Sequence, residues 1–264
     1  MDGKKTAVLV AGSWGTALAS VLADNGREVL LWTRRKEQEE EINKQHTNAR
    51  YLPGTVLSDR IRATTDLEEA VRNAAAVVIV APSASLREVT SRLRGLVNPN
   101  TAIIHATKGF EPETLKRMSE VIAEELPEMD PGRIVVLSGP SHAEEVVRRC
   151  PTTVVVAAEQ LDAAEYAQDL FMSRYFRVYT NPDIIGVEVA GALKNIIALG
   201  AGMNDGLEYG DNAKAALMTR GLSEIIRLGI AMGSNPLTFA GLAGLGDMVV
   251  TCTSRHSRNW RAGY

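Results

Sequence analysis

The feature that most constrains the fold is a run of short apolar segments that alternate with helix-like segments over residues 1–182. The apolar segments are nearly continuous in Val, Ile and Ala, which is typical of strands buried on both faces. Their alternation with helices predicts an α/β fold with a doubly wound, mostly parallel sheet. The predicted strands are residues 6–11, 28–33, 60–65, 76–81, 101–106, 133–139, 152–158 and 175–180; helices are predicted at 67–74, 86–96 and 113–126.

The pattern changes after residue 181. From Ile184 onward there is no strand signal, and residues 184–203 and 212–232 are typical of long helices rich in small residues. Asp183 is a suitable cap for the first of these helices. The chain is therefore divided into residues 1–182, expected to form a dinucleotide-binding domain, and residues 183–264, expected to form an all-helical substrate-binding domain.

A glycine turn follows the first predicted strand, in the sequence VAGSWGTALA. Gly12 and Gly15 have the spacing of the second and third glycines of the dinucleotide-binding pattern G-x-G-x-x-G, but Val10 occupies the first position. A β-branched residue tolerates positive φ poorly, whereas a β-like backbone at Val10 would cost only local packing. A helix that begins near Trp14 would direct its N–H groups at a phosphate. An ordinary tight turn is the alternative.

Two arginines follow the second predicted strand, where NAD-selective folds carry an acidic residue. The guanidinium groups of Arg34 and Arg35 suit a 2′-phosphate, which favours NADP over NAD. The alternative is a solvated helix start in which an arginine pairs with a carboxylate within residues 37–41.

Further polar residues follow later strands, at the edge where such sheets bind ligands. Lys108 comes just after one strand, and Gly139, Pro140 and Ser141 lie at a strand-to-helix junction suited to an anion or a carbonyl group. A loop lysine and a serine N-cap are the alternatives.

Lys194 lies on a small, apolar helix face with Ala190, Gly191, Ile197 and Ala198. Burial there would lower the pKa of the lysine and make proton exchange with a substrate feasible. The alternative is a lysine that extends along the helix edge to water.

The last motif combines Asp247, after a glycine-rich turn, with the triplet Ser257, Arg258 and Asn259. Arginine with Ser and Asn donors is suited to phosphate. A basic surface turn is the alternative.

The overall composition excludes several classes of protein. A net charge of −3 gives no general electrostatic attraction to nucleic acid or to an anionic membrane. The two cysteines are far apart and have no metal-ligand spacing, so a reduced, cytoplasmic protein without a metal is expected. No apolar run approaches the roughly 20 residues of a membrane span.

Several of these motifs together resemble the bacterial NAD(P)-dependent glycerol-3-phosphate dehydrogenases over essentially the whole chain. They are AGSWGTALA, ATKG, LSGPSHAEE, the segment with GALKN, GDNAKAALMTRGL and GLGDMVVTCTSRHSRNWRAG. The resemblance implies a Rossmann-type domain followed by a helical domain. It also implies reversible hydride transfer between NADPH and dihydroxyacetone phosphate, which gives sn-glycerol 3-phosphate for phospholipid synthesis.

The resemblance also implies roles for individual residues. Lys194 would donate the proton to the carbonyl oxygen in reduction and accept it in the reverse direction. The cofactor would contact Ser13, Trp14, Arg34, Arg35, Lys108, Ala143 and Arg258. The substrate would contact Lys108, Gly139, Ser141, Lys194, Asp247, Ser257, Arg258 and Asn259.

Three departures from the family pattern suggest alternatives to this function. Val10 replaces a glycine, Ala81 replaces a valine, and family members continue past this chain with helices and a glutamate that contacts the cofactor. A shortened helical domain would expose apolar surface and favour a homo-oligomer. A non-catalytic or impaired nucleotide-binding relative is therefore one alternative, and a Rossmann dehydrogenase of a small hydroxy acid is another.

Overall fold

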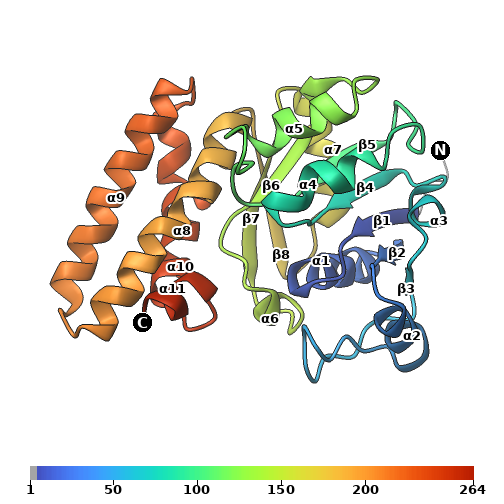
Figure 1. Cartoon of the computed structure of the whole chain (residues 1–264), viewed down its shortest axis with the longest axis horizontal. Coiled ribbons are helices and arrows are strands. Elements are labelled where there is room, and N and C mark those ends of the chain that lie inside the picture. The colour runs from blue at the N-terminus through green and yellow to red at the C-terminus, as the bar shows by residue number, and fades with distance from the viewer. Residues whose placement is uncertain (1–4) are drawn as a thin grey trace.

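The computed structural model describes residues 5–264, and its centre is one eight-stranded sheet in the order β3-β2-β1-β4-β5-β6-β7-β8 (Figure 1). All eight predicted strands are confirmed. Their bounds are β1 Lys5–Leu9, β2 Glu28–Trp32, β3 Ile61–Thr64, β4 Ala76–Ile79, β5 Ala102–His105, β6 Val135–Ser138, β7 Thr152–Ala157 and β8 Phe176–Asn181.

The sheet is mostly parallel, as predicted. Strands β1 to β6 are parallel to their neighbours, β7 runs antiparallel to β6, and β8 is parallel to β7. The carboxyl ends of β1, β2, β4, β5 and β6 therefore meet at one edge of the sheet, which is where ligands bind in such folds.

Helices cover both faces of the sheet, so the strands are buried on both sides. One apolar cluster packs Leu18 and Leu22 of α1 with Leu170 of α7, and a second contains Leu86 of α4 and Ile122 of α5. The helices of this part are α1 Ser13–Asp24, α2 Lys36–Gln45, α3 Leu67–Val71, α4 Ser83–Ser91, α5 Met118–Glu125, α6 Ala143–Val146 and α7 Leu161–Phe171, with a 3₁₀ turn at Pro131–Arg133.

The three helices predicted at 67–74, 86–96 and 113–126 differ from the observed ones in their bounds. Helix α3 ends at Val71 rather than residue 74. Helix α4 begins directly after Pro82, which fixes the backbone at its N-cap, and ends at Ser91 rather than residue 96. Helix α5 begins at Met118 rather than residue 113, because Leu115 has a φ of +58° and Phe110 forms a bridge with Arg117. A residue with positive φ cannot continue a right-handed helix.

The described residues after Asn181 are helical and contain no strand, as predicted (Figure 1). Asp183 caps α8 as expected, since its carboxylate accepts a hydrogen bond from Gly186 N at 2.8 Å. The elements are α8 Ile184–Gly206, α9 Asp211–Ala231, a 3₁₀ turn Pro236–Ala240, a π-helical turn Leu242–Gly246, α10 Asp247–Thr253 and α11 Arg258–Gly263.

Helix α8 is the central element of this part. It packs against β6, α9, α10 and α11, and it approaches α11 so closely that a Cβ on Gly202 would lie 2.0 Å from the carbonyl oxygen of Trp260. With a mean hydropathy of 1.6 over 18 residues it is long and apolar enough to cross a membrane, contrary to the expectation from the sequence. However, 56% of that window is buried inside the protein, which is the environment of a core helix.

Candidate active site

Of the two backbone conformations expected for Val10, a positive φ and a β-like backbone, the structure has the strained one, a positive φ. Its φ is +78°, in the region that favours glycine and that β-branched residues avoid. Val10 N donates to Trp32 O at 3.1 Å, and Val10 O accepts from Gly12 N at 2.9 Å. A Cβ on Gly15 would lie 2.2 Å from Val10 O, so Gly15 is required for the close approach of α1 to the turn. The turn therefore keeps its glycine-type geometry despite the valine.

A buried polar network holds the next residue of this turn. The side-chain amides of Gln38 and Asn48 donate to Ala11 O at 2.6 and 3.1 Å, and Asn48 also donates to Thr16 Oγ1 at 2.8 Å. Both amide side chains are buried, so these hydrogen bonds satisfy groups that would otherwise be costly to bury.

The two arginines after β2 lie in different settings. Arg34 pairs with Glu88 of α4 at 3.1 Å, so its carboxylate partner does not come from residues 37–41. Arg35 is the N-cap residue of α2, and its backbone N donates to Thr33 Oγ1 at 3.2 Å.

Two lysines from different parts of the chain share one carboxylate. Lys108 Nζ donates to Asp247 Oδ2 at 2.5 Å and lies 3.3 Å from Gly139 O. Lys194 Nζ lies 3.4 Å from Asp247 Oδ1 and donates to Thr251 Oγ1 at 2.7 Å. Gly191 allows α8 to approach β6 closely beside these groups, because a Cβ there would lie 3.1 Å from Ser138 Oγ.

Lys194 is buried, with only 5% of its surface exposed, so the alternative of a lysine extended to water is wrong. Burial lowers the pKa of Lys194 to about 8, and the positive charge of Lys108 acts in the same direction. The negative charge of Asp247 opposes both effects. The group is thus an ammonium near neutral pH that can release its proton in the physiological range.

The loop after β6 is followed by a much shorter helix than the predicted anion site at its N-terminus requires. Gly139 has a φ of +130°, and its carbonyl accepts from Ser141 Oγ at 2.9 Å. The helix that follows is only Ala143–Val146, which is too short to supply a substantial helix dipole to residues 139–141. Any ligand there would be held by single groups rather than by a long helix.

His256, which directly precedes the triplet at residues 257–259, lies near His142 at the end of that same loop. The centres of the two rings are 5.6 Å apart. Ser257 is the N-cap of α11 and accepts from Trp260 N at 3.2 Å. The side chain of Arg258 is exposed, so its guanidinium is open to a ligand.

Comparison with known proteins identifies the family to which this chain belongs. Residues 5–164 match the family described as NAD-dependent glycerol-3-phosphate dehydrogenase N-terminus, and residues 183–264 match the corresponding C-terminus. The chain belongs to the NAD-dependent glycerol-3-phosphate dehydrogenase family.

Relatives of the chain include two bacterial proteins named glycerol-3-phosphate dehydrogenase [NAD(P)+]. The protein of Lysinibacillus sphaericus is 59% identical over 98% of this chain and 77% of its own length, and that of Bacillus anthracis is 62% identical over 98% and 76%. A crystal structure of glycerol-3-phosphate dehydrogenase from Coxiella burnetii is 41% identical, with a TM-score of 0.92, over 97% of this chain and 78% of that one. The chain thus spans about three quarters of the length of these relatives.

The glycine turn fits the dinucleotide cofactor of the glycerol-3-phosphate dehydrogenase family. A Cβ on Gly12 would meet nothing within 4 Å, so space is open where a pyrophosphate approaches the backbone. Helix α1 has no side-chain cap and no acidic residue in its first turn, which leaves its N–H groups available to an anion. Trp14 Nε1 is buried without a hydrogen-bond partner.

The structure brings the predicted residues into two groups. Lys108, Gly139, Ser141, Lys194 and Asp247 are linked by direct contacts, and the loop with Ser257, Arg258 and Asn259 joins them through the histidine contact. Ser13, Trp14, Arg34 and Arg35 belong to the glycine turn and the end of β2, and Ala143 of α6 packs in the same apolar cluster as Trp14.

Sequence reasoning missed three polar residues that this arrangement uses. Thr251 lies four residues after Asp247, and that spacing on α10 could have indicated it. Gln38 and Asn48 lie outside every motif, and no local signal marks them.

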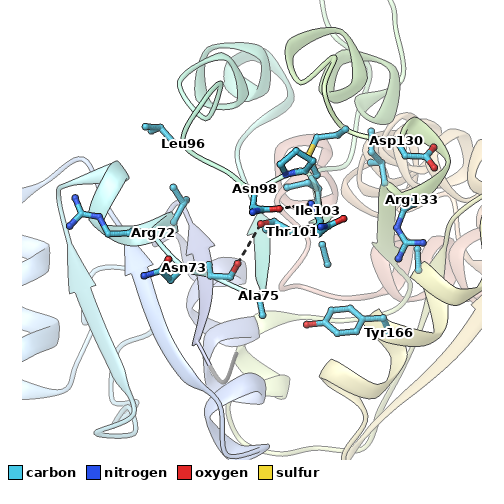
Figure 2. A pocket seen from close by; sticks show the side chains of 18 of the residues that line it. Arg72, Asn73, Ala75, Leu96, Asn98, Thr101, Ile103, Asp130, Arg133 and Tyr166 are labelled. Atoms are coloured by element: carbon cyan, nitrogen blue, oxygen red, sulfur yellow. Dashed lines mark hydrogen bonds between the residues drawn. The ribbon is translucent and has the colours of Figure 1, made fainter. Parts of the chain in front are cut away.

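A cavity of about 990 Å³ lies elsewhere, at the amino ends of β4 and β5 (Figure 2). Figure 2 shows Arg72, Arg133 and Tyr166 among its lining residues. Its two labelled arginines already pair with carboxylates, Arg72 with Glu68 at 2.9 Å and Arg133 with Asp162 at 2.6 Å. The described residues contain no group of three or more side chains that could hold a metal ion.

The strain at Val10 leads to a testable expectation. Val10→Gly is expected to lower the KM for NADPH by about 3- to 10-fold, because holding a non-glycine residue at positive φ costs about 1–2 kcal/mol that weakens the turn in contact with the cofactor. Val10→Ala is the matched control, since it removes the β-branch and keeps the backbone penalty. An unchanged KM in the glycine variant would show that the turn is held rigidly by its neighbours and that the strain does not affect binding.

Proposed function

We propose that the chain catalyses the reversible reduction of dihydroxyacetone phosphate to sn-glycerol 3-phosphate with NADPH, and with NADH as the alternative coenzyme. The observation that carries this proposal is the cluster of buried Lys194 and Asp247 with half-buried Lys108, which places two cations around one carboxylate at the ligand-binding edge of the sheet. Family membership supports the same reaction.

In this reaction the bound nicotinamide coenzyme supplies the hydride to the carbonyl carbon. Lys194, as an ammonium, stabilises the negative charge that develops on the carbonyl oxygen and then gives that oxygen a proton. Asp247 and Thr251, one turn apart on α10, orient the Lys194 amine. Lys108 supplies a second positive charge beside it, which lowers the pKa of Lys194 and favours release of the proton.

The remaining substrate contacts are assigned by position. Arg258, with Ser257 and Asn259, would hold the phosphate, and the energy of that remote contact would orient the carbonyl. Gly139 and Ser141 would contact the substrate from the loop after β6, whose last residue, His142, lies near His256. We assign cofactor binding to residues 1–182, of which 1–4 lie outside the described residues, and completion of the substrate site to residues 183–264.

The cellular setting is part of the same proposal. Two unpaired cysteines support a cytoplasmic protein, in which the product would supply glycerol phospholipid synthesis. Exposed apolar side chains on α8, namely Ile196, Leu199 and Met203, support a homo-oligomer.

The reaction is tested by following the absorbance of NADPH with and without dihydroxyacetone phosphate. The expected result is oxidation that requires the substrate and is lost when unphosphorylated dihydroxyacetone replaces it at the same concentration. Pyruvate is added in parallel as the precursor of a small hydroxy acid. A folded protein that binds NADPH but oxidises it neither with dihydroxyacetone phosphate nor with pyruvate would be a non-catalytic relative, contrary to the proposal.

The lowered pKa of Lys194 predicts opposite pH profiles for the two directions. Reduction needs the ammonium, so its kcat/KM should fall as the pH rises through about 8. Oxidation of glycerol 3-phosphate needs the neutral amine, so its kcat/KM should rise over the same range. The second pKa of the substrate phosphate is about 6, so its titration does not overlap the change expected near pH 8. Profiles that bend in the same direction would contradict the role of Lys194.

A further inference from the structure

The ion pair between Arg34 and Glu88 connects two segments on either side of the glycine turn. Arg34 follows β2, Glu88 lies on α4 after β4, and β1 with its glycine turn lies between those strands in the sheet. The Arg34 guanidinium is 3.1 Å from the Glu88 carboxylate and 5.9 Å from the centre of the Trp32 ring. About half of each charged side chain is exposed, at 50% and 59%, so the pair lies where a ligand can reach it.

We propose that Glu88 determines coenzyme preference by competing with the 2′-phosphate of NADP for Arg34. This inference rests on the proposed function, in which Arg34 contacts the cofactor. A 2′-phosphate that binds Arg34 must either displace the Glu88 carboxylate or lie beside it as a like charge, and both weaken binding. NAD has a hydroxyl at that position and does not require the arginine to leave its partner. Glu88 therefore lowers the affinity for NADP and leaves that for NAD unchanged.

The size of the effect follows from the exposure of the pair. An ion pair this exposed contributes little in water, so its loss changes affinity by no more than about fivefold. Repulsion between the carboxylate and a doubly charged phosphate a few ångströms away adds a factor of similar size. Removal of the Glu88 charge is thus expected to strengthen binding of a 2′-phosphate by about 3- to 10-fold at low salt, and by less at high salt.

The test uses Glu88→Gln and two nucleotides that differ only in the 2′-phosphate, adenosine 2′,5′-bisphosphate and adenosine 5′-monophosphate. Titration calorimetry measures both dissociation constants without turnover. The variant should bind the bisphosphate about 3- to 10-fold more tightly and the monophosphate as the wild type does. Glu68→Gln is the matched control, because it breaks the equally exposed pair between Arg72 and Glu68 away from the glycine turn. In an Arg34→Gln background, Glu88→Gln should strengthen bisphosphate binding by clearly less than in the wild type, because only the direct repulsion between carboxylate and phosphate is then relieved.

Other outcomes overturn the inference in distinguishable ways. Unchanged or weaker binding of the bisphosphate by Glu88→Gln would mean that Glu88 holds Arg34 in place for the phosphate rather than competing with it. An equal gain for both nucleotides, or a gain that is undiminished without Arg34, would mean a general charge effect. If the wild-type protein binds neither nucleotide, the proposed function fails as well.

Discussion

Lys194→Met is expected to lower kcat for the reduction of dihydroxyacetone phosphate by about 10³-fold. A positioned general acid contributes about 10²- to 10⁴-fold to such a step, and loss of the ammonium also removes charge stabilisation at the carbonyl oxygen. Methionine has nearly the same length and no proton to give. It would occupy the buried volume between α8 and α10 without adding an unpaired charge, because Asp247 keeps its contact with Lys108. The rate of NADPH oxidation in a single turnover measures the effect on chemistry directly.

Two controls separate chemistry from folding in that experiment. Thr251→Val removes only the hydroxyl that accepts from Lys194, so it should cost much less than the loss of the lysine. Binding of NADPH by Lys194→Met should stay within about twofold of the wild-type value, since the glycine turn is formed by β1 and α1. A decrease in kcat of less than about tenfold would assign the proton to another group.

Glu188→Ala is expected to lower the free energy of unfolding by about 3–5 kcal/mol. The Glu188 carboxylate is buried, with only 2% of the side chain exposed, and it joins α8 to the start of α5 and the end of β5. It accepts from Arg117 Nη1, Ser119 N and Ser119 Oγ, each at 2.7 Å, and lies 3.1 Å from His105 Nε2. Removal of the carboxylate leaves the Arg117 charge, of which only 13% is exposed, without its buried partner.

Urea denaturation of the wild type and two variants measures this effect. Glu188→Gln is the matched variant, because it keeps an acceptor oxygen and the side-chain volume while it removes the charge, and it should be less destabilising than alanine. Breaking the exposed pair of Arg149 and Asp24, with Arg149→Gln, should cost about 1 kcal/mol or less. A loss below about 1 kcal/mol for Glu188→Ala would show that water enters and solvates Arg117.

The sequence by itself determined the fold class and the order of its elements. The eight strands are short, nearly continuous apolar runs, and such runs indicate burial on both faces of a sheet. Asp183 indicates the start of α8, because a capping carboxylate bonds to a backbone N–H only three residues away. The burial of Lys194 was also predictable, because Ala190, Gly191 and Ala198 share its helix face. Helix boundaries were less predictable where a single φ decides them, as at Leu115.

Only the tertiary structure decided how the candidate site is assembled. Asp247 joins Lys108 across 139 positions, Lys194 reaches Thr251 across 57, and Arg34 finds Glu88 across 54 rather than a neighbouring glutamate. Gln38 and Asn48 hold the glycine turn from a helix and a loop that carry no motif. Local periodicity reports which face of an element is buried, whereas the partner of a polar group depends on which elements the packed sheet brings together. The positive φ of Val10 has the same origin, because the hydrogen bond to Trp32 of β2 and the close packing of Gly15 favour that backbone although the residue is a valine.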